Sequence, residues 1–155
     1  DIQEILDSST NGVVYFSMGS ILKSSDLPAE TKRGLLKLLG ELPYTVLWKF
    51  EEQLKDLPKN LHVKAWMPQA AILALRYGVP LVAVPVFGDQ PANAAQAVRS
   101  GYAVKVHFDE VQLADNLRPA LKEILNNDSY YKQAKYLSFL FNNRPVPPTK
   151  LIAHY

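Results

Sequence analysis

Short apolar runs alternate along this chain with longer stretches in which apolar residues recur at helical spacing. The run Val13–Ser17 is almost continuously apolar and rich in β-type residues, as is typical of a parallel strand covered on both faces. A later run, after Gly78, is interrupted by Pro80 and Pro85. The pattern predicts strands over residues 13–17, 44–50, 61–64, 79–86 and 103–107.

Helices are predicted before, between and after these strands. Pro28 begins the clearest one, in which leucines at positions 35, 36, 38 and 39 form a stripe that can be buried. Pro119 lies inside another and is expected to kink that helix or to shift its start. The remaining helices are predicted over residues 1–8, 68–74, 92–100, 111–126 and 129–141.

The alternation of strands and helices predicts an α/β fold, with a Rossmann-like parallel sheet and helices on both of its faces. We expect Val13–Ser17 to be central in that sheet and Val82–Val84 to lie near it. A chain of 155 residues fits one domain, predicted over residues 1–141, with a tail over 142–155 that leaves the globule. Both ends of the chain are expected to be cut from a longer protein.

Composition and charge exclude several classes of function. The net charge is only +2, and the basic residues are scattered, which argues against a nucleic-acid partner. The chain has no cysteine, so disulfides, thiolate chemistry and cysteine-based zinc sites are excluded. No stretch approaches the roughly 18 apolar residues that cross a bilayer. These residues are therefore not expected to contain a membrane-spanning segment, and contact with a membrane is expected only through a segment absent here, as the resemblance described below implies.

Polar clusters follow the carboxyl ends of the predicted strands, where ligands bind in open parallel sheets. A Gly-Ser turn brings backbone N–H groups to a phosphate, an exposed Trp is a stacking platform for a base, and a neighbouring Asp and Gln can clamp sugar hydroxyls. The four clusters are Ser17-Met18-Gly19-Ser20, Lys49 in Leu47-Trp48-Lys49-Phe50, Trp66-Met67-Pro68-Gln69 and Val86-Phe87-Gly88-Asp89-Gln90-Pro91.

Each cluster also has a simpler structural explanation. The Gly-Ser segment can be a tight strand-exit turn, Trp66 a core residue, Asp89 a helix N-cap, and Lys49 a solvated strand end. No Gly-x-Gly-x-x-Gly occurs, which argues against a nicotinamide-dependent dehydrogenase. The three histidines, at positions 62, 107 and 154, are isolated, and none is assigned a catalytic or metal-binding role.

Taken in order along the chain, these motifs resemble the carboxyl-terminal domain of the UDP-glucuronosyltransferase and UDP-glucosyltransferase family. The resemblance spans essentially the whole chain. It rests on Tyr15–Ser20, Val46–Phe50, Trp66–Gln69, the segment from Gly78-Val79-Pro80 to Pro91, and the closing segment from Phe141 to Tyr155.

The resemblance implies the carboxyl-terminal half of a two-domain glycosyltransferase-B fold, which holds a UDP-sugar such as UDP-glucuronate or UDP-glucose and no further cofactor. It places Trp66 on the uracil, Gln69 on the nucleoside, Ser20 and Lys49 by the diphosphate, and Asp89 and Gln90 on the sugar hydroxyls. The catalytic base, a histidine oriented by an aspartate, belongs to the amino-terminal half, so no residue of this chain is assigned to catalysis.

The chain departs from the family pattern at Ala74-Leu75. In the family, a strand, a His-Gly-Gly turn and a helix with a Glu follow the helix after the Trp-Pro-Gln motif. Here residues 72–74 run directly into Leu75-Arg76-Tyr77-Gly78. Losing these contacts to the diphosphate and ribose costs about 4 kcal/mol or more, which predicts weak UDP-sugar binding. Because helix joins helix, the alternation survives, and we expect the fold to tolerate the loss better than the site does.

The resemblance implies transfer of a hexosyl group to a small lipophilic acceptor bound by the amino-terminal half, on the lumenal side of the endoplasmic reticulum membrane. An association of identical subunits is compatible with it. The isolated chain is expected to be inactive. An alternative is a non-catalytic truncated isoform that pairs with or regulates intact subunits. An unrelated nucleotide-binding α/β module is disfavoured because it leaves the four motifs in register unexplained.

Overall fold

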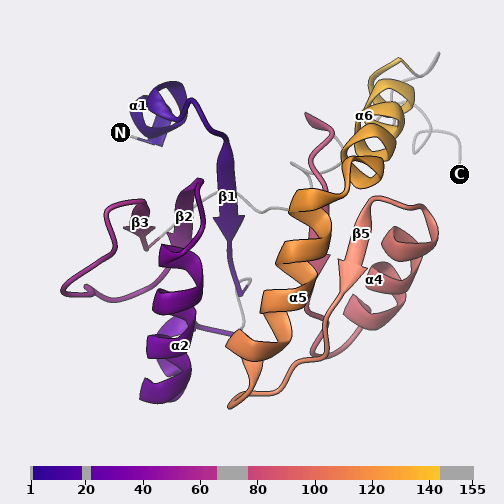
Figure 1. Cartoon of the computed structure of the whole chain (residues 1–155). Helices are drawn as coiled ribbons and strands as arrows, with labels where there is room; N and C mark the ends of the chain where they lie inside the picture. Colours follow the sequence, from indigo (N-terminus) through magenta and orange to yellow (C-terminus); the bar gives the residue numbers. More distant parts are fainter. Residues whose placement is uncertain (1, 19–21, 66–76, 144–155) are drawn as a thin grey trace, which may run out of the picture. The chain divides into compact units, whose positions relative to one another are not determined.

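The structure is a computed structural model that describes residues 2–18, 22–65 and 77–143 (Figure 1). It has the predicted α/β fold, and every pair of neighbouring strands that it describes is parallel. The chain divides into two compact units. The first consists of Asp1–Ala70 and His107–Pro119, and the second of Ala71–Val106 and Ala120–Tyr155. One of the boundaries between them falls inside helix α5, directly after Pro119.

The first unit is built on a three-stranded parallel sheet in the order β1-β2-β3. Val14 of β1 lies opposite Val46 of β2, and Val46 lies opposite Leu61 of β3. The elements of this unit are α1 (Ile2–Ser8), β1 (Val13–Phe16), the 3-10 turn η1 (Ser24–Asp26), α2 (Ala29–Gly40), β2 (Thr45–Lys49), β3 (Leu61–Lys64) and the first part of α5 (Leu113–Asn126).

The core of the first unit surrounds β2, which has a neighbour on each side. Val46, Leu47 and Trp48 of this strand are buried. Four leucines of α2 were predicted to form its buried stripe. Three of them are buried, whereas Leu36 is half-exposed. Burying such side chains is worth roughly 1.5–3 kcal/mol each, so β2 and α2 hold this unit together.

Helix α2 also packs closely against the start of α5. Gly34 allows this approach, because a Cβ atom placed on it would lie only 3.0 Å from the Cβ of Ala114. The buried hydroxyl of Thr31 donates a hydrogen bond of 2.6 Å to the carbonyl of Glu110, just before α5. This contact ties the returning segment 107–119 to the first unit.

The second unit contains a two-stranded parallel sheet of β4 and β5, joined by α4. Gly78 precedes this sheet with a positive φ of 67°, and a Cβ atom there would lie 2.9 Å from the Cα of Lys135. The Lys135 ammonium donates to the carbonyl of Tyr77 at 2.8 Å, so α6 is fixed on the start of the unit. The elements are β4 (Leu81–Ala83), α4 (Gln90–Arg99), β5 (Ala103–Lys105), the end of α5 and α6 (Asp128–Asn142).

Four of the five predicted strands are shorter in the structure, and the one predicted over residues 79–86 is shortened most. The run over residues 79–86 forms a strand only at Leu81–Ala83, because Pro80 and Pro85 have no N–H to donate to a ladder. The run over 103–107 ends as a strand at Lys105, although the Val106 N–H still donates to Ala83. Pro119 lies within a continuous helix. The helix predicted from Pro68 falls outside the described residues.

The prediction of one sheet with the Val13 strand at its centre was wrong. In the part of the chain that the structure describes, β1 is an outer strand of its sheet, and β4 and β5 form a separate sheet. Dinucleotide-binding folds have the strand order 3-2-1-4-5-6. The order β3-β2-β1 of the first unit and the pairing of β4 with β5 in the second unit each match a part of that order. The further strand that the resemblance implies near residues 74–75 stays a prediction.

Candidate functional site

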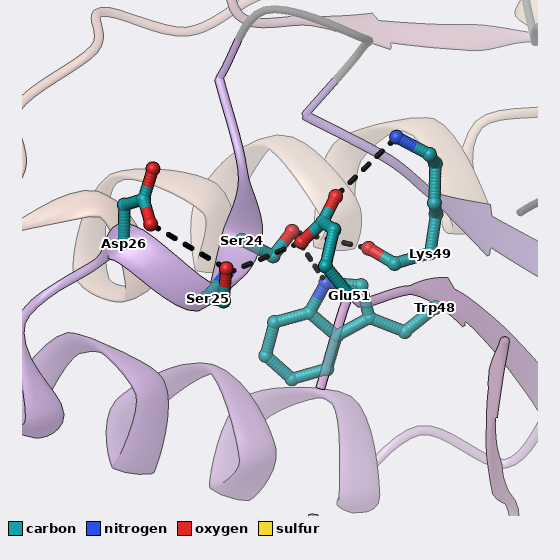
Figure 2. A network of polar contacts seen from close by, with 6 residues as sticks. All are labelled: Ser24, Ser25, Asp26, Trp48, Lys49 and Glu51. Carbon is teal, nitrogen blue, oxygen red and sulfur yellow. Dashed lines mark hydrogen bonds and ion pairs between the residues drawn. The ribbon is translucent and has the colours of Figure 1, made fainter. Parts of the chain in front are cut away.

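A network of polar contacts surrounds the carboxyl end of β2 in the first unit (Figure 2). Lys49 is the last residue of this strand, and successive side chains along a strand point to opposite faces. Trp48 and Phe50 are therefore directed into the core, where they are 0% and 1% exposed. Lys49 and Glu51 share the other side, where their side chains meet.

Lys49 and Glu51 form an ion pair. The distance from Lys49 Nζ to Glu51 Oε1 is 3.3 Å, and the two side chains are only 16% and 21% exposed. The second carboxylate oxygen of Glu51 accepts a hydrogen bond of 3.3 Å from the backbone N–H of Ser25. The simpler reading of Lys49 as a solvated strand end is therefore not what the structure shows.

Ser24 ties the η1 turn to the end of β2. Its hydroxyl is fully buried, accepts a hydrogen bond from Trp48 Nε1 at 3.1 Å and donates one to the Lys49 carbonyl at 3.1 Å. The backbone of Lys49 is thus held from the buried side, while its ammonium group lies beside Glu51 (Figure 2). Lys32 strengthens the same turn, because its ammonium donates to the Ser25 carbonyl and lies 5.9 Å from the centre of the Phe50 ring.

Sequence reasoning missed Ser24 and Glu51. Glu51 could have been found, because the alternation in Trp48-Lys49-Phe50-Glu51 already places Lys49 and Glu51 on one side. Ser24 had no such signal, since it lies 24 residues before its partner Trp48 and in a polar loop.

A second polar cluster lies in the second unit, between the end of β4 and the start of α4. Gly88 takes a positive φ of 66°, which favours glycine, and nothing lies within 4 Å of a Cβ placed there. Gln90 closes this turn, because its side-chain oxygen accepts a hydrogen bond from the Val86 N–H at 2.9 Å. The sequence predicted Asp89 and Gln90 next to a helix start, and the structure places them there.

Asp89 occupies the N-cap position of α4, but its side chain makes no capping hydrogen bond. One carboxylate oxygen accepts a hydrogen bond of 2.9 Å from the Asn93 side chain, and the residue is exposed. The interpretation of Asp89 as a simple N-cap is therefore incomplete. A carboxylate held in place by one neighbour and open to solvent is suited to accept hydrogen bonds from hydroxyl groups.

The other predicted site residues lie outside the described residues. These are Ser20, Trp66 and Gln69. Lys49 belongs to the first unit, and Asp89 and Gln90 to the second, so the prediction that all six meet at one site stays a prediction. Within the described ranges, His, Asp and Glu side chains form no cluster that could hold a metal ion. No helix of the described residues is long and apolar enough to cross a membrane.

Solved structures similar to this chain share its fold. The chain matches the glycosyltransferase VinC, solved in complex with dTDP, with a TM-score of 0.69 and 16% identity over 97% of this chain and 42% of that one. It matches the spinosyn rhamnosyltransferase SpnG with a TM-score of 0.67 and 18% identity over 92% of this chain and 44% of that one. The α/β fold is thus that of one part of a larger glycosyltransferase.

Proteins related in sequence identify the family more specifically than the solved structures do. The chain is 32% identical to UDP-glucosyltransferase 2 of Dactylopius coccus, over 96% of this chain and 32% of the relative. It is also 32% identical to human UDP-glucuronosyltransferase 2B28, over 96% of this chain and 31% of the relative. The chain therefore spans about a third of the length of these curated relatives.

The alignments with these relatives are longer than this chain. The two alignments contain 167 and 169 positions, more than the 155 residues of the whole chain. The relatives therefore have residues with no counterpart here, as expected if a segment is absent. The family model described as UDP-glucoronosyl and UDP-glucosyl transferase matches residues 1–154. This chain belongs to that family.

Proposed function

We propose that this chain is the donor-binding domain of a UDP-glycosyltransferase, and that it holds a UDP-sugar such as UDP-glucuronate or UDP-glucose. The observation that supports this most directly is the position of Lys49 at the carboxyl end of β2, and of Asp89-Gln90 in the connection that leads from the carboxyl end of β4 into α4. Ligands of open α/β sheets bind at these ends. VinC, which shares the fold, was solved with the nucleoside diphosphate dTDP.

In this proposal each of the six binding residues contacts a different part of the UDP-sugar or shares one part with a neighbour. Trp66 stacks on the uracil and Gln69 contacts the nucleoside. Ser20 and Lys49 lie by the diphosphate, and Asp89 and Gln90 bind the sugar hydroxyls. Binding is weak, because the segment missing at residues 74–75 would supply contacts to the diphosphate and the ribose. We expect a dissociation constant in the millimolar range, which corresponds to about −4 kcal/mol.

The assignment of Asp89 can be tested with UDP and UDP-glucose in parallel. A hydrogen bond to a charged group is worth roughly 1.5–3 kcal/mol, so Asp89→Asn should weaken UDP-glucose by about tenfold or more. UDP has no sugar, and its affinity should not change. Amide chemical-shift titrations at millimolar ligand concentrations measure both constants.

Asp115→Asn is the matched control, because Asp115 is an exposed carboxylate on α5. It should change neither constant. An equal loss of UDP and UDP-glucose affinity in Asp89→Asn would show that Asp89 does not contact the sugar. The absence of any shift with either ligand would contradict the proposed function itself.

The whole protein is proposed to transfer a hexosyl group to a small lipophilic acceptor on the lumenal side of the endoplasmic reticulum membrane. The acceptor and the catalytic base are assigned by resemblance to the amino-terminal half. We therefore expect the purified chain alone to transfer no sugar from UDP-glucose or UDP-glucuronate to a phenol. Mass spectrometry of the reaction mixture measures this, with Trp66→Ala as control. Glycoside formation by the purified chain above that control would contradict the expectation.

A further inference from the structure

The ion pair between Lys49 and Glu51 has a consequence for anion binding, which rests on the proposed function. Lys49 is the cation assigned to the diphosphate, yet a carboxylate already lies 3.3 Å from its ammonium group. Both side chains are largely covered, so water screens the pair less than it would an exposed one. A phosphate that approaches Lys49 therefore meets a cation whose charge is largely balanced by Glu51.

The Glu51 carboxylate is held in place by more than Lys49. It accepts a hydrogen bond from the Ser25 N–H on the η1 turn, and Lys32 holds the carbonyl of that same residue. The Asp26 carboxylate, beside the Ser25 hydroxyl at 3.5 Å, adds a further negative charge to the turn. An anion that binds the Lys49 ammonium group therefore meets a carboxylate that stays in place.

We infer that Glu51 is an internal counter-ion that competes with the donor's phosphates for Lys49, and so limits the affinity of this domain for the diphosphate. Because its carboxylate lies 3.3 Å from the Lys49 ammonium group, it also repels a doubly charged diphosphate that binds to that group. Uridine carries no phosphate and does not meet this competition. Glu51 therefore reduces the preference of the site for UDP over uridine.

The test is a titration of UDP and of uridine into four proteins, followed by amide chemical shifts. The proteins are the unchanged chain, Glu51→Gln, Lys49→Met and the double variant. Glu51→Gln keeps an oxygen that can accept from the Ser25 N–H, so the turn should persist, and the amide spectrum shows whether it does. We expect Glu51→Gln to tighten UDP by about tenfold and to leave uridine unchanged.

In the Lys49→Met background the gain from Glu51→Gln should fall to about threefold or less, because no ammonium is released there. Glu52→Gln is the matched control. It removes the same charge one residue away, on an exposed side chain, and should change UDP affinity less than twofold.

Three results would overturn the inference. If Glu51→Gln leaves UDP affinity unchanged or weakens it, Glu51 does not compete with the phosphates, and the inference fails while the proposed function stands. If neither the unchanged chain nor any variant binds UDP or uridine, the proposed function fails and the inference fails with it. If Glu52→Gln tightens UDP binding as much as Glu51→Gln does, the gain comes only from the loss of one negative charge near the site. That result would also overturn the inference.

Discussion

Restoring the family segment between Ala74 and Leu75 is expected to tighten UDP binding by at least about tenfold, or ~1.4 kcal/mol. By resemblance the segment carries the His-Gly-Gly turn that meets the diphosphate and the Glu that meets the ribose. Contacts to a charged diphosphate are worth more than neutral ones, and base stacking of roughly 1–3 kcal/mol does not replace them. Titration calorimetry with UDP on the chain with and without the segment measures the difference.

The same insertion is expected to raise the unfolding temperature. The alternation of strands and helices alone suggested that folding would change little, but the described strands form one sheet of three strands and another of two. A two-stranded sheet is marginal by itself, and the second unit has only β4 and β5 among its described residues. The largest fully buried side chains all belong to the first unit, so the second has the most to gain from a further strand.

A Gly-Ser segment of the same length, inserted at the same position, is the control for this experiment. It adds chain without a strand or a phosphate-binding turn, and it should improve neither UDP affinity nor the thermal midpoint. Equal UDP affinity in two folded versions, with and without the family segment, would mean that the site never depended on that turn. If only the restored chain folds, the segment is structural as well as functional.

The elements of the fold could be predicted because their signals are local. Leu61–Lys64 was predicted with its observed bounds, and Val13–Phe16 to within one residue. The order of the strands in a sheet has no local signal in the sequence. Among the described residues β1 has a neighbour on one side only, and nothing within Val13–Phe16 predicts this. The signal in the sequence is the departure from the family pattern at Ala74-Leu75, where the resemblance implies a further strand.

The site was predictable to the extent that strand ends reveal it. Lys49, Asp89 and Gln90 stand where the pattern placed them, because the carboxyl end of a strand can be read from an apolar run followed by polar residues. The partners of these residues could not be read in the same way. Ser24 reaches Trp48 and Lys49 across a loop, and Asn93 reaches Asp89 only once α4 has formed. Both sets of hydrogen bonds depend on how the chain folds and not on a pattern in the sequence.

Trp48→Ala is expected to destabilise the chain by about 3–5 kcal/mol, the largest effect of any single substitution considered. Trp48 is 0% exposed at the centre of the three-stranded sheet. Its ring centre lies 5.5 Å from that of Phe16 and 5.0 Å from that of Phe50, so removing the indole leaves a cavity between two aromatic rings. Urea denaturation followed by circular dichroism measures the change.

Tyr136→Ala is the control for the loss of an aromatic side chain, because Tyr136 is 57% exposed on α6 and should change stability by less than about 0.5 kcal/mol. A loss below about 2 kcal/mol in Trp48→Ala would mean that the ring is not packed as the structure shows. Trp48→Phe keeps most of the packing but removes the N–H that donates to Ser24, and should cost roughly 1 kcal/mol.

Trp48→Phe also links the core to the site. The Ser24 hydroxyl still donates to the Lys49 carbonyl in this variant, but it no longer receives a hydrogen bond from the indole. If the indole holds the η1 turn in place, Glu51 should lose part of its alignment with Lys49, because the Ser25 N–H belongs to that turn. We therefore expect Trp48→Phe to shift the amide resonances of residues 24–26 and 49–51, while those of the second unit stay unchanged. Unchanged resonances over residues 24–26 would show that Ser24 is held by the Lys49 carbonyl alone.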